Sequence, residues 1–375
     1  MKSLVLSGGG ARGAYQVGVL NAISDISTEL RIKNPFRIYT GVSAGAINAG
    51  FLASGADDFA VITRRLADFW SDLESGQVFK TDAISLGKIG LKWMGELSFG
   101  AITGATQGRA LLDTSPLWEL LKNNCDFSRI QKNIDQGHMQ SVAVSAIDYK
   151  TSTTITFMQG DDSVPLWQRS RRSAERVLLK IEHVMASAAI PVLFPPVNVE
   201  SRFFGDGCVR NLTPCSPAIH MGSDQLMVIG VRKQQETAYD KMLNASTMPP
   251  SVAKVMNMLL NAVLLDGIEV DIERLNRINE FLNRVPDSHQ EKLNFKRVEH
   301  VFICPSEDIG QIAASMASRL PRVIRYLLKG LGPLEDASEI ISYLMFEREF
   351  TTRLIEVGYK DGMAQKESIQ EFLQK

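Results

Sequence analysis

The first part of the chain alternates short apolar runs with glycine turns and helical stretches. Residues 4–6 form an apolar run that ends at 7–10, and apolar residues then recur at helical spacing over 14–23. The pattern repeats, because an apolar segment at 37–40 runs into a second glycine-containing turn at 41–45. Short apolar runs bounded by glycine turns predict buried strands. Two successive strand–turn–helix units therefore predict an α/β fold with a mainly parallel central sheet and helices on both faces.

Periodicity also predicts the elements of the remaining chain. Residues 76–108 intersperse glycines with apolar side chains and predict an irregular insertion, whereas nearly everything after 304 has helical spacing. No repeat or linker separates these parts, so the C-terminal region should pack on the core. The other predicted elements are helices over 58–73, from 115, over 174–189 and over 252–282 (broken near Gly267), and strands over 140–147, 151–157, 225–231 and 298–304.

Composition narrows the class of protein. The 375 residues are 45% hydrophobic and 22% charged, which is typical of a packed globular chain and excludes a disordered one. With 41 Lys+Arg against 42 Asp+Glu, the net charge of −1 argues against nucleic acid as a partner. The four cysteines form no CxxC pair, so we expect a reducing compartment and no zinc site or disulfide framework. We find no signal-peptide or transmembrane pattern, which predicts a cytoplasmic protein and leaves export without a cleavable signal open.

The second glycine turn contains the strongest chemical signal. Its residues Gly41, Val42, Ser43, Ala44 and Gly45 form a GxSxG sequence between a predicted strand and a predicted helix. In such an elbow the small neighbours permit a sharp turn that exposes the serine hydroxyl, and the helix N-terminus favours negative charge there. A plain turn whose serine caps the helix is the alternative.

The first glycine turn satisfies the pattern GxGxxG and has two functional interpretations. A dinucleotide-binding loop needs an acidic residue at the end of the next strand, where this chain has Thr40 and Gly41 instead. An oxyanion hole needs several backbone N–H groups that converge on one oxygen, and consecutive glycines allow this. We favour the oxyanion hole over the dinucleotide site or a purely structural turn. The residues of this turn are Gly8, Gly9, Gly10, Ala11, Arg12 and Gly13.

Ser43 needs a base, and the sequence favours an aspartate over a histidine. None of the five histidines lies in a recognisable catalytic loop. Asp206 follows an apolar strand and stands between Gly205 and Gly207. An Asp-Gly pair is often a simple turn, but beside a GxSxG sequence we interpret Asp206 as the base.

Several segments, in order, resemble the patatin-like phospholipase family. They are SGGGARGAYQVGVL, GVSAGAIN, the helix start at 115–117, the segments 185–191 and 194–196, and the pair Asp206-Gly207. The resemblance covers residues 4–219 and implies a three-layer α/β/α catalytic domain, with 220–375 as a mostly helical C-terminal region whose strand at 298–304 joins the core sheet. One position departs from the family, which has Gly or Ala where this chain has Cys208.

The resemblance also implies a chemistry. Ser43 would be the nucleophile and Asp206 the base of a Ser–Asp dyad, and backbone groups of the 8–13 loop would form the oxyanion hole. The implied activity is hydrolysis of lipid acyl esters through an acyl-enzyme, of the phospholipase A or lysophospholipase type, without metal or cofactor. An acyltransferase or thioesterase that uses the same serine, and a lipid-binding regulator without turnover, remain as alternatives.

A lipid substrate requires a surface that meets a membrane or micelle. Residues 86–99 combine leucines, Trp93 and two lysines, and residues 318–330 predict a basic amphipathic helix with four cations on one side. Basic amphipathic helices bind anionic membrane surfaces, although an ordinary helix packed on the core has the same pattern. Peripheral membrane contact through 86–99 or 318–330 is therefore a hypothesis, and the oligomeric state stays open.

Overall fold

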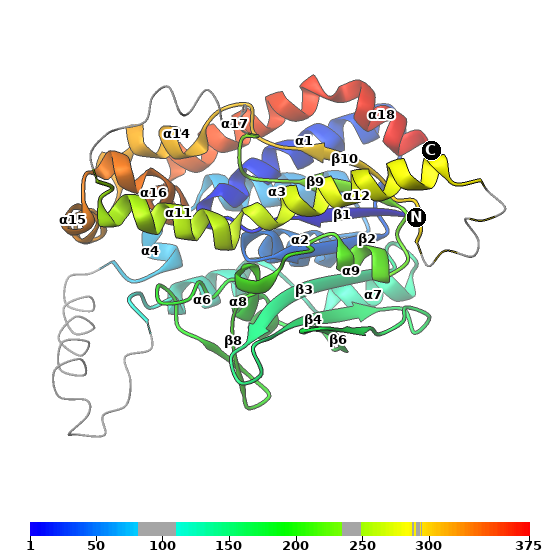
Figure 1. The fold of residues 1–375 in the computed structure, drawn as a ribbon, viewed down its shortest axis with the longest axis horizontal. Coiled ribbons are helices and arrows are strands. Elements are labelled where there is room, and N and C mark those ends of the chain that lie inside the picture. The colour runs from blue at the N-terminus through cyan, green and yellow to red at the C-terminus, as the bar shows by residue number, and fades with distance from the viewer. Residues whose placement is uncertain (82–109, 235–248, 287–288, 290–292, 294) are drawn as a thin grey trace.

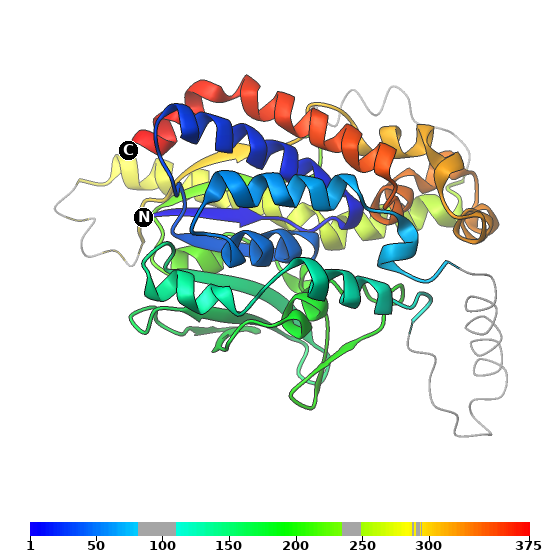
Figure 2. The ribbon, with the colours of Figure 1, turned by 180° about the vertical axis from the view of Figure 1, so that it is seen from behind.

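The computed structural model describes residues 1–81, 110–234, 249–286, 289, 293 and 295–375, which form helices on both faces of a central sheet (Figures 1 and 2). Five neighbouring strands run parallel, and the sheet continues with antiparallel and mixed pairing beyond β3. The α/β fold with a mostly parallel sheet is thus confirmed. In sheet order the strands are β10 (Glu299–Ile303), β9 (Gln225–Ile229), β1 (Lys2–Leu6), β2 (Ile38–Val42), β3 (Ser141–Asp148), β4 (Thr153–Gly160), β6 (Arg172–Arg176) and β5 (Gln168–Arg169), while β8 (Arg202–Asp206) pairs with β3 and β7 (Val197–Val199) with β8.

The central strands are buried on both faces. Leu4 and Leu6 of β1 contribute to the main core, whereas Val5 between them packs in a second cluster with α9 and α12. Alternate residues of a strand point to opposite faces, so a fully apolar run suits a sheet that is covered on both sides. The helices of the first part of the chain are α1 (Gly13–Glu29), α2 (Ala44–Ser54), α3 (Phe59–Ser71), α4 (Ser75–Val78), α6 (Ser115–Asn124), α7 (Arg129–Asp135), α8 (Ile181–Ser187) and α9 (Ser216–His220).

The C-terminal region is helical, as predicted, and its strand β10 pairs with β9 at the edge of the sheet. Helix α17 lies along α1 over the sheet (Figure 1). Among the described helices, none is long and apolar enough to cross a membrane. The C-terminal helices are α11 (Val252–Leu264), α12 (Asp266–Arg284), α14 (Ile309–Ser315), α15 (Arg322–Leu331), α16 (Ser338–Leu344), α17 (Arg348–Ala364) and α18 (Lys366–Gln374).

Two helix predictions were wrong in extent. The predicted helix over 174–189 is instead strand β6 followed by the short helix α8, because the backbone of β6 pairs with β4 and this pairing overrides the local helical pattern. The predicted helix over 318–330 begins only at Arg322, because Pro321 precedes it in an extended conformation. Most of the predicted insertion 76–108, including 86–99, lies outside the described residues.

Candidate active site

The two glycine turns meet at the carboxyl ends of neighbouring parallel strands. Leu6 at the end of β1 is paired with Gly41 in β2, so the turns that follow lie side by side. Gly8 lies against both other segments of the site: a methyl group there would come within 2.9 Å of Ser43 Cβ and 2.3 Å of Cys208 Sγ. The fold therefore brings together the glycine loop, the GxSxG turn and the Asp-Gly pair.

Ser43 occupies a strained elbow between β2 and α2. Its φ of 56° and ψ of −126° lie in a region that residues with a side chain rarely adopt. Gly41 and Gly45 permit the sharp turn, because a methyl on Gly41 would lie 2.0 Å from the Gly45 carbonyl oxygen. The Ser43 amide donates a hydrogen bond to Ser187 Oγ at 3.0 Å, and Ser187 in turn donates to the Ser145 carbonyl at 2.6 Å. The elbow is thus held by backbone contacts, and the hydroxyl makes no capping bond to α2.

Asp206 is fully buried at the end of β8, beside Ser43. Its Oδ1 accepts the Cys208 amide at 2.8 Å, and its own amide donates to the Ala189 carbonyl at 2.8 Å. Among the described residues Oδ2 has no hydrogen-bond partner. Burial raises the pKa of Asp206 to about 6, which the Ser43 hydroxyl and the Cys208 amide and thiol partly oppose. One buried oxygen of a carboxyl with raised basicity is therefore free to receive a proton.

The Ser43 hydroxyl lies near enough to Asp206 to influence its pKa, but the pair does not meet the distance and angle limits of a hydrogen bond. Catalytic hydrogen bonds are often long in an enzyme without substrate and shorten when substrate binds. Asp206 is therefore a candidate base because it lies close to Ser43 and has a free Oδ2, although the two side chains form no preformed hydrogen bond.

The glycine loop presents its backbone to the site. Gly10 has a φ of 56° and lies under the C-terminal region, where a methyl group would meet the Tyr343 carbonyl oxygen at 2.4 Å. Within the described part of the chain, the Gly9 and Gly10 amides donate to no acceptor. Residues 10–12 form a single 3-10 turn before Gly13 begins α1. Gly10 lines the same pocket as Ser43, and unpaired backbone N–H groups in such a loop suit an oxyanion.

The Arg12 side chain points away from this loop. Its guanidinium is buried, pairs with Glu339, donates to Ser342 Oγ at 2.7 Å and stacks over the Tyr343 ring at 5.0 Å. All three partners belong to α16. Since Glu339 neutralises the charge of Arg12, this residue connects the loop to the C-terminal region, and it does not line the pocket around Ser43.

Cys208 directly follows the Asp206-Gly207 pair. Its side chain is buried in a small cluster with Val42 and Tyr343 and does not line the pocket around Ser43. Burial, with the Asp206 carboxylate nearby, raises the pKa of the thiol well above its ordinary value, so the thiol is neutral. The side chain therefore packs between Gly8 and Asp206 without adding charge.

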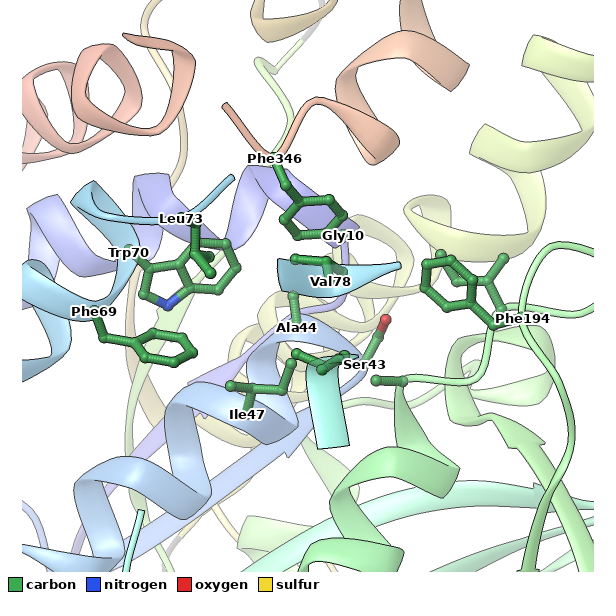
Figure 3. Close-up of a pocket in the computed structure, with 13 residues that line it drawn as sticks. Gly10, Ser43, Ala44, Ile47, Phe69, Trp70, Leu73, Val78, Phe194 and Phe346 are labelled. Carbon is green, nitrogen blue, oxygen red and sulfur yellow. The ribbon is translucent and has the colours of Figure 1, made fainter. Parts of the chain in front are cut away.

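The Ser43 hydroxyl opens into an apolar pocket (Figure 3). Aromatic residues surround it from three parts of the chain: Trp70 in α3, Phe194 before β7, and Phe346 after α16. Among the described residues, Ser43 is the one hydroxyl or charged side chain in a lining otherwise made of Gly10, Ala44, Ile47, Phe69, Trp70, Leu73, Val78, Leu117, Ala188, Ile190, Phe194 and Phe346. Such a lining suits a hydrocarbon chain.

No histidine contributes to this pocket. His183, in the helix just before the segment 185–191, packs against Phe157 with the ring centroids 4.7 Å apart and the rings tilted, and it accepts a hydrogen bond from the Lys180 amide. Burial lowers the pKa of His183, so its imidazole is neutral at pH 7. The described geometry offers Ser43 an aspartate and no histidine.

Sequence reasoning missed several residues that hold the site. Ser187 was part of the segment 185–191 but received no role, and only its bonds to Ser43 and Ser145 reveal one. Behind the elbow, Trp70 donates to Asn48 Oδ1 at 2.7 Å, and Asn48 donates to Gln16 Oε1 at 2.9 Å. One amide side chain within each of two apolar helices, Gln16 in α1 and Asn48 in α2, was the signal that could have found this network.

Similar solved structures are distant in sequence. They include VipD from Legionella pneumophila (TM-score 0.36, 14% identity, covering 98% of this chain and 67% of that one). They also include human GIVD cytosolic phospholipase A2 in complex with methyl gamma-linolenyl fluorophosphonate (TM-score 0.39, 11% identity, covering 100% of this chain and 59% of that one). No curated protein sequence matches.

The family comparison is specific. The model that describes patatin-like phospholipases matches residues 4–219, more than half of the chain. The match spans the glycine loop, the GxSxG elbow and the Asp-Gly pair, which the fold brings together. The chain belongs to the patatin-like phospholipase family and, in general terms, is a lipid acyl hydrolase.

Proposed function

We propose that the protein hydrolyses acyl esters of phospholipids or lysophospholipids with Ser43 as nucleophile and Asp206 as base. One observation carries the proposal: a strained serine opens into an apolar pocket beside a buried carboxyl whose Oδ2 has no partner among the described residues. The pocket would receive the acyl chain, so that the ester carbonyl lies near the Ser43 hydroxyl.

The proposed reaction has two steps. Ser43 Oγ attacks the carbonyl carbon while its proton passes to Asp206 Oδ2, and the Gly9 and Gly10 amides bind the oxyanion. When the tetrahedral intermediate collapses, the alcohol leaves with that proton and the acyl group stays on Ser43. Water then attacks the acyl-enzyme, again giving its proton to Asp206, and the fatty acid is released as Ser43 recovers its proton.

An aspartate is a weak base for an alcohol, and its surroundings reduce this difficulty. An ordinary Asp with a pKa near 3.8 holds a proton poorly at pH 7, whereas burial raises the pKa of Asp206 to about 6. The basicity is thus nearer to that of a histidine. The strained elbow adds positioning, because the hydroxyl is held in place before substrate arrives.

Two variants test the dyad. Ser43→Ala and Asp206→Asn should each lower the hydrolysis of a soluble medium-chain ester by about 10³-fold or more, because each removes a group that acts only with the other. Thermal melts would show whether both variants stay folded. His183→Gln is the control and should keep most activity, since His183 packs against Phe157 and does not line the pocket. The dyad is wrong if Asp206→Asn stays active while a histidine variant does not.

Fluorophosphonate labelling distinguishes the enzyme from its alternatives. Ser43 should form a covalent adduct with the probe in the native chain and none in Ser43→Ala, as expected for an activated serine. A lipid-binding regulator would remain unlabelled. Product analysis with an added acceptor alcohol then separates a hydrolase, which releases free fatty acid, from an acyltransferase, which forms a new ester.

A further inference from the structure

Helix α11 exposes apolar side chains on the side that faces away from the core. Ala253, Asn257 and Leu264 form its buried side. The opposite side has apolar residues at helical spacing: Val252, Val255, Met256, Met258, Leu259 and Val263, with Met258 63% and Leu259 55% exposed. A surface helix normally turns its polar side outward, so a stripe of this kind marks a site of interaction.

Helix α15, which contacts α11, also exposes apolar side chains. Its residues Ile324 and Leu328 are buried, whereas Tyr326 is 77% exposed and Leu327 lies exposed beside it. The two helices are in contact, since Gly332 at the end of α15 lies against Ser251 and Ala253 at the start of α11. We define the docking face as the outward stripe of α11 together with Tyr326 and Leu327.

The docking face has a basic rim that lies mainly on α15, whereas the cleft beside Met258 and Lys254 in α11 also contains Asp266, Asp308, Glu335 and Glu339. Lys254, Arg322, Arg325 and Lys329 lie on these two helices, and none of them forms an ion pair within the described residues. Arg325 donates only to the Ser318 carbonyl. By contrast, Arg319, just before α15, is paired with Glu349. Unpaired cations near exposed apolar side chains complement a surface that combines anionic groups with hydrocarbon.

The docking face lies at the active-site end of the molecule. In Figure 1 the N-terminus marks one end of the sheet, and α15, the start of α11 and α4 lie at the opposite end, toward which the parallel strands run. Helix α16 packs against α11 and is followed by Phe346, which lines the pocket. A bilayer seated on this face would meet the molecule near the pocket.

We propose that the docking face binds the surface of a lipid bilayer that contains anionic headgroups, and so presents lipid to the pocket. This inference rests on the proposed function for its purpose, but the binding itself does not require turnover. The methionines adapt to an irregular apolar surface, and the tyrosine suits the boundary between hydrocarbon and water. The basic rim selects the bilayer over an uncharged protein surface.

Vesicle sedimentation tests the proposal in the Ser43→Ala chain, which should leave lipid intact. Binding to phosphatidylcholine vesicles that contain phosphatidylglycerol should exceed binding to phosphatidylcholine alone and should decrease with salt. Each set of changes on the docking face should weaken binding roughly tenfold or more. The apolar set is Met258→Ser, Leu259→Ser and Leu327→Ser, and the basic set is Arg322→Gln, Arg325→Gln and Lys329→Gln.

Matched controls come from exposed residues elsewhere. The apolar control is Leu166→Ser, Leu178→Ser and Leu212→Ser, and the basic control is Arg64→Gln, Lys132→Gln and Lys150→Gln. Both should bind like the parent. If the docking-face variants also bind like the parent, the proposal is wrong. The proposal is also wrong if the parent does not bind vesicles but forms a dimer in sedimentation velocity, and the docking-face variants abolish that dimer.

Hydrolysis of a soluble ester keeps the two proposals separate. In chains that retain Ser43, the docking-face variants should hydrolyse the ester normally, because none of the changed residues lines the pocket. If ester hydrolysis survives Ser43→Ala, the proposed function fails and the vesicle result still stands. If vesicle binding ignores the docking face, the surface proposal fails and the proposed function still stands.

Discussion

The two turns at the heart of the candidate site lie on neighbouring strands, yet different parts of the chain hold them. The serine elbow is held from within residues 4–219: Gly45 lies against the Leu6 carbonyl, and Ser187 accepts the Ser43 amide. The glycine loop is held from the C-terminal region, where Tyr343 covers Gly10 and α16 binds Arg12.

This difference separates two tasks of a serine hydrolase. The position of Ser43, the proposed nucleophile, depends on contacts inside the region that the family model matches. The position of the backbone amides depends on contacts with α16, which lies beyond that region. We therefore expect changes in the C-terminal region to affect stabilisation of the oxyanion and to leave the serine elbow intact.

Among changes that loosen the glycine loop, the largest expected effect comes from Gly10→Ala. The methyl group would collide with the Tyr343 carbonyl at 2.4 Å and would occupy a positive φ, so the loop must move. Loss of an oxyanion donor lowers kcat by roughly 10²–10³-fold. Steady-state kinetics on a soluble ester measure it. Gly137→Ala is the matched control, because Gly137 also has a positive φ but no atom within 4 Å of the added methyl. Equal activity of both variants would remove the loop from the mechanism.

Glu339→Gln tests the hold of α16 on the loop. It leaves the buried Arg12 guanidinium without its anion and should lower the free energy of unfolding by on the order of 2 kcal/mol, less than for a fully buried pair because the Glu339 side chain is 22% exposed. Because the loop loosens, kcat should fall while KM for a soluble ester stays similar. Glu307→Gln, which breaks the more exposed pair with Arg353, is the control. A variant that loses stability but keeps kcat would show that Arg12 has only a structural role.

Asp206→Asn should stabilise the fold while it removes activity. The pKa of Asp206 is about 6 in the folded chain against an ordinary 3.8, so burial disfavours its charge by roughly 3 kcal/mol at most. That penalty is complete above pH 6, where the carboxyl is ionised in both the folded and the unfolded chain. It is absent below about pH 3.8, where the carboxyl is protonated in both. Urea unfolding at pH 7.5 should show the gain, and at pH 4 the gain should shrink. Asp162→Asn, which changes an exposed aspartate, should not alter the stability at either pH. If Asp206→Asn is no more stable than the parent at pH 7.5, Asp206 does not carry a destabilising buried charge.

The smallest effect concerns the pH profile. If Asp206 accepts the proton, kcat/KM should fall about tenfold per pH unit below a pKa near 6, since only the carboxylate can act as base. The limb should persist in His183→Gln. If the acidic limb of the profile disappears in His183→Gln, the base is a histidine and not Asp206.

The sequence predicted the chemistry-bearing turns better than it predicted what surrounds them. Glycine turns after apolar strands are local signals, so the elbow at Ser43 and the neighbouring glycine loop followed from spacing alone. Strand β6 was mistaken for helix because its residues 172–176 have no strand alternation, and only pairing with β4 makes them a strand. The direction of the Arg12 side chain was equally hidden, since its partner Glu339 lies in a helix that no local pattern connects to the loop.

The packing of α1 on α17 limits which substitutions the two helices can accept. Gly18 lies against the Ile355 carbonyl and Gly358 against the Tyr15 carbonyl, each so closely that a methyl group would come within 2.0 Å and 2.1 Å of the oxygen. Neither helix can therefore gain a side chain at these positions while its partner stays in place. A chimera that replaces residues 4–219, which contain α1, would therefore also need a matching α17.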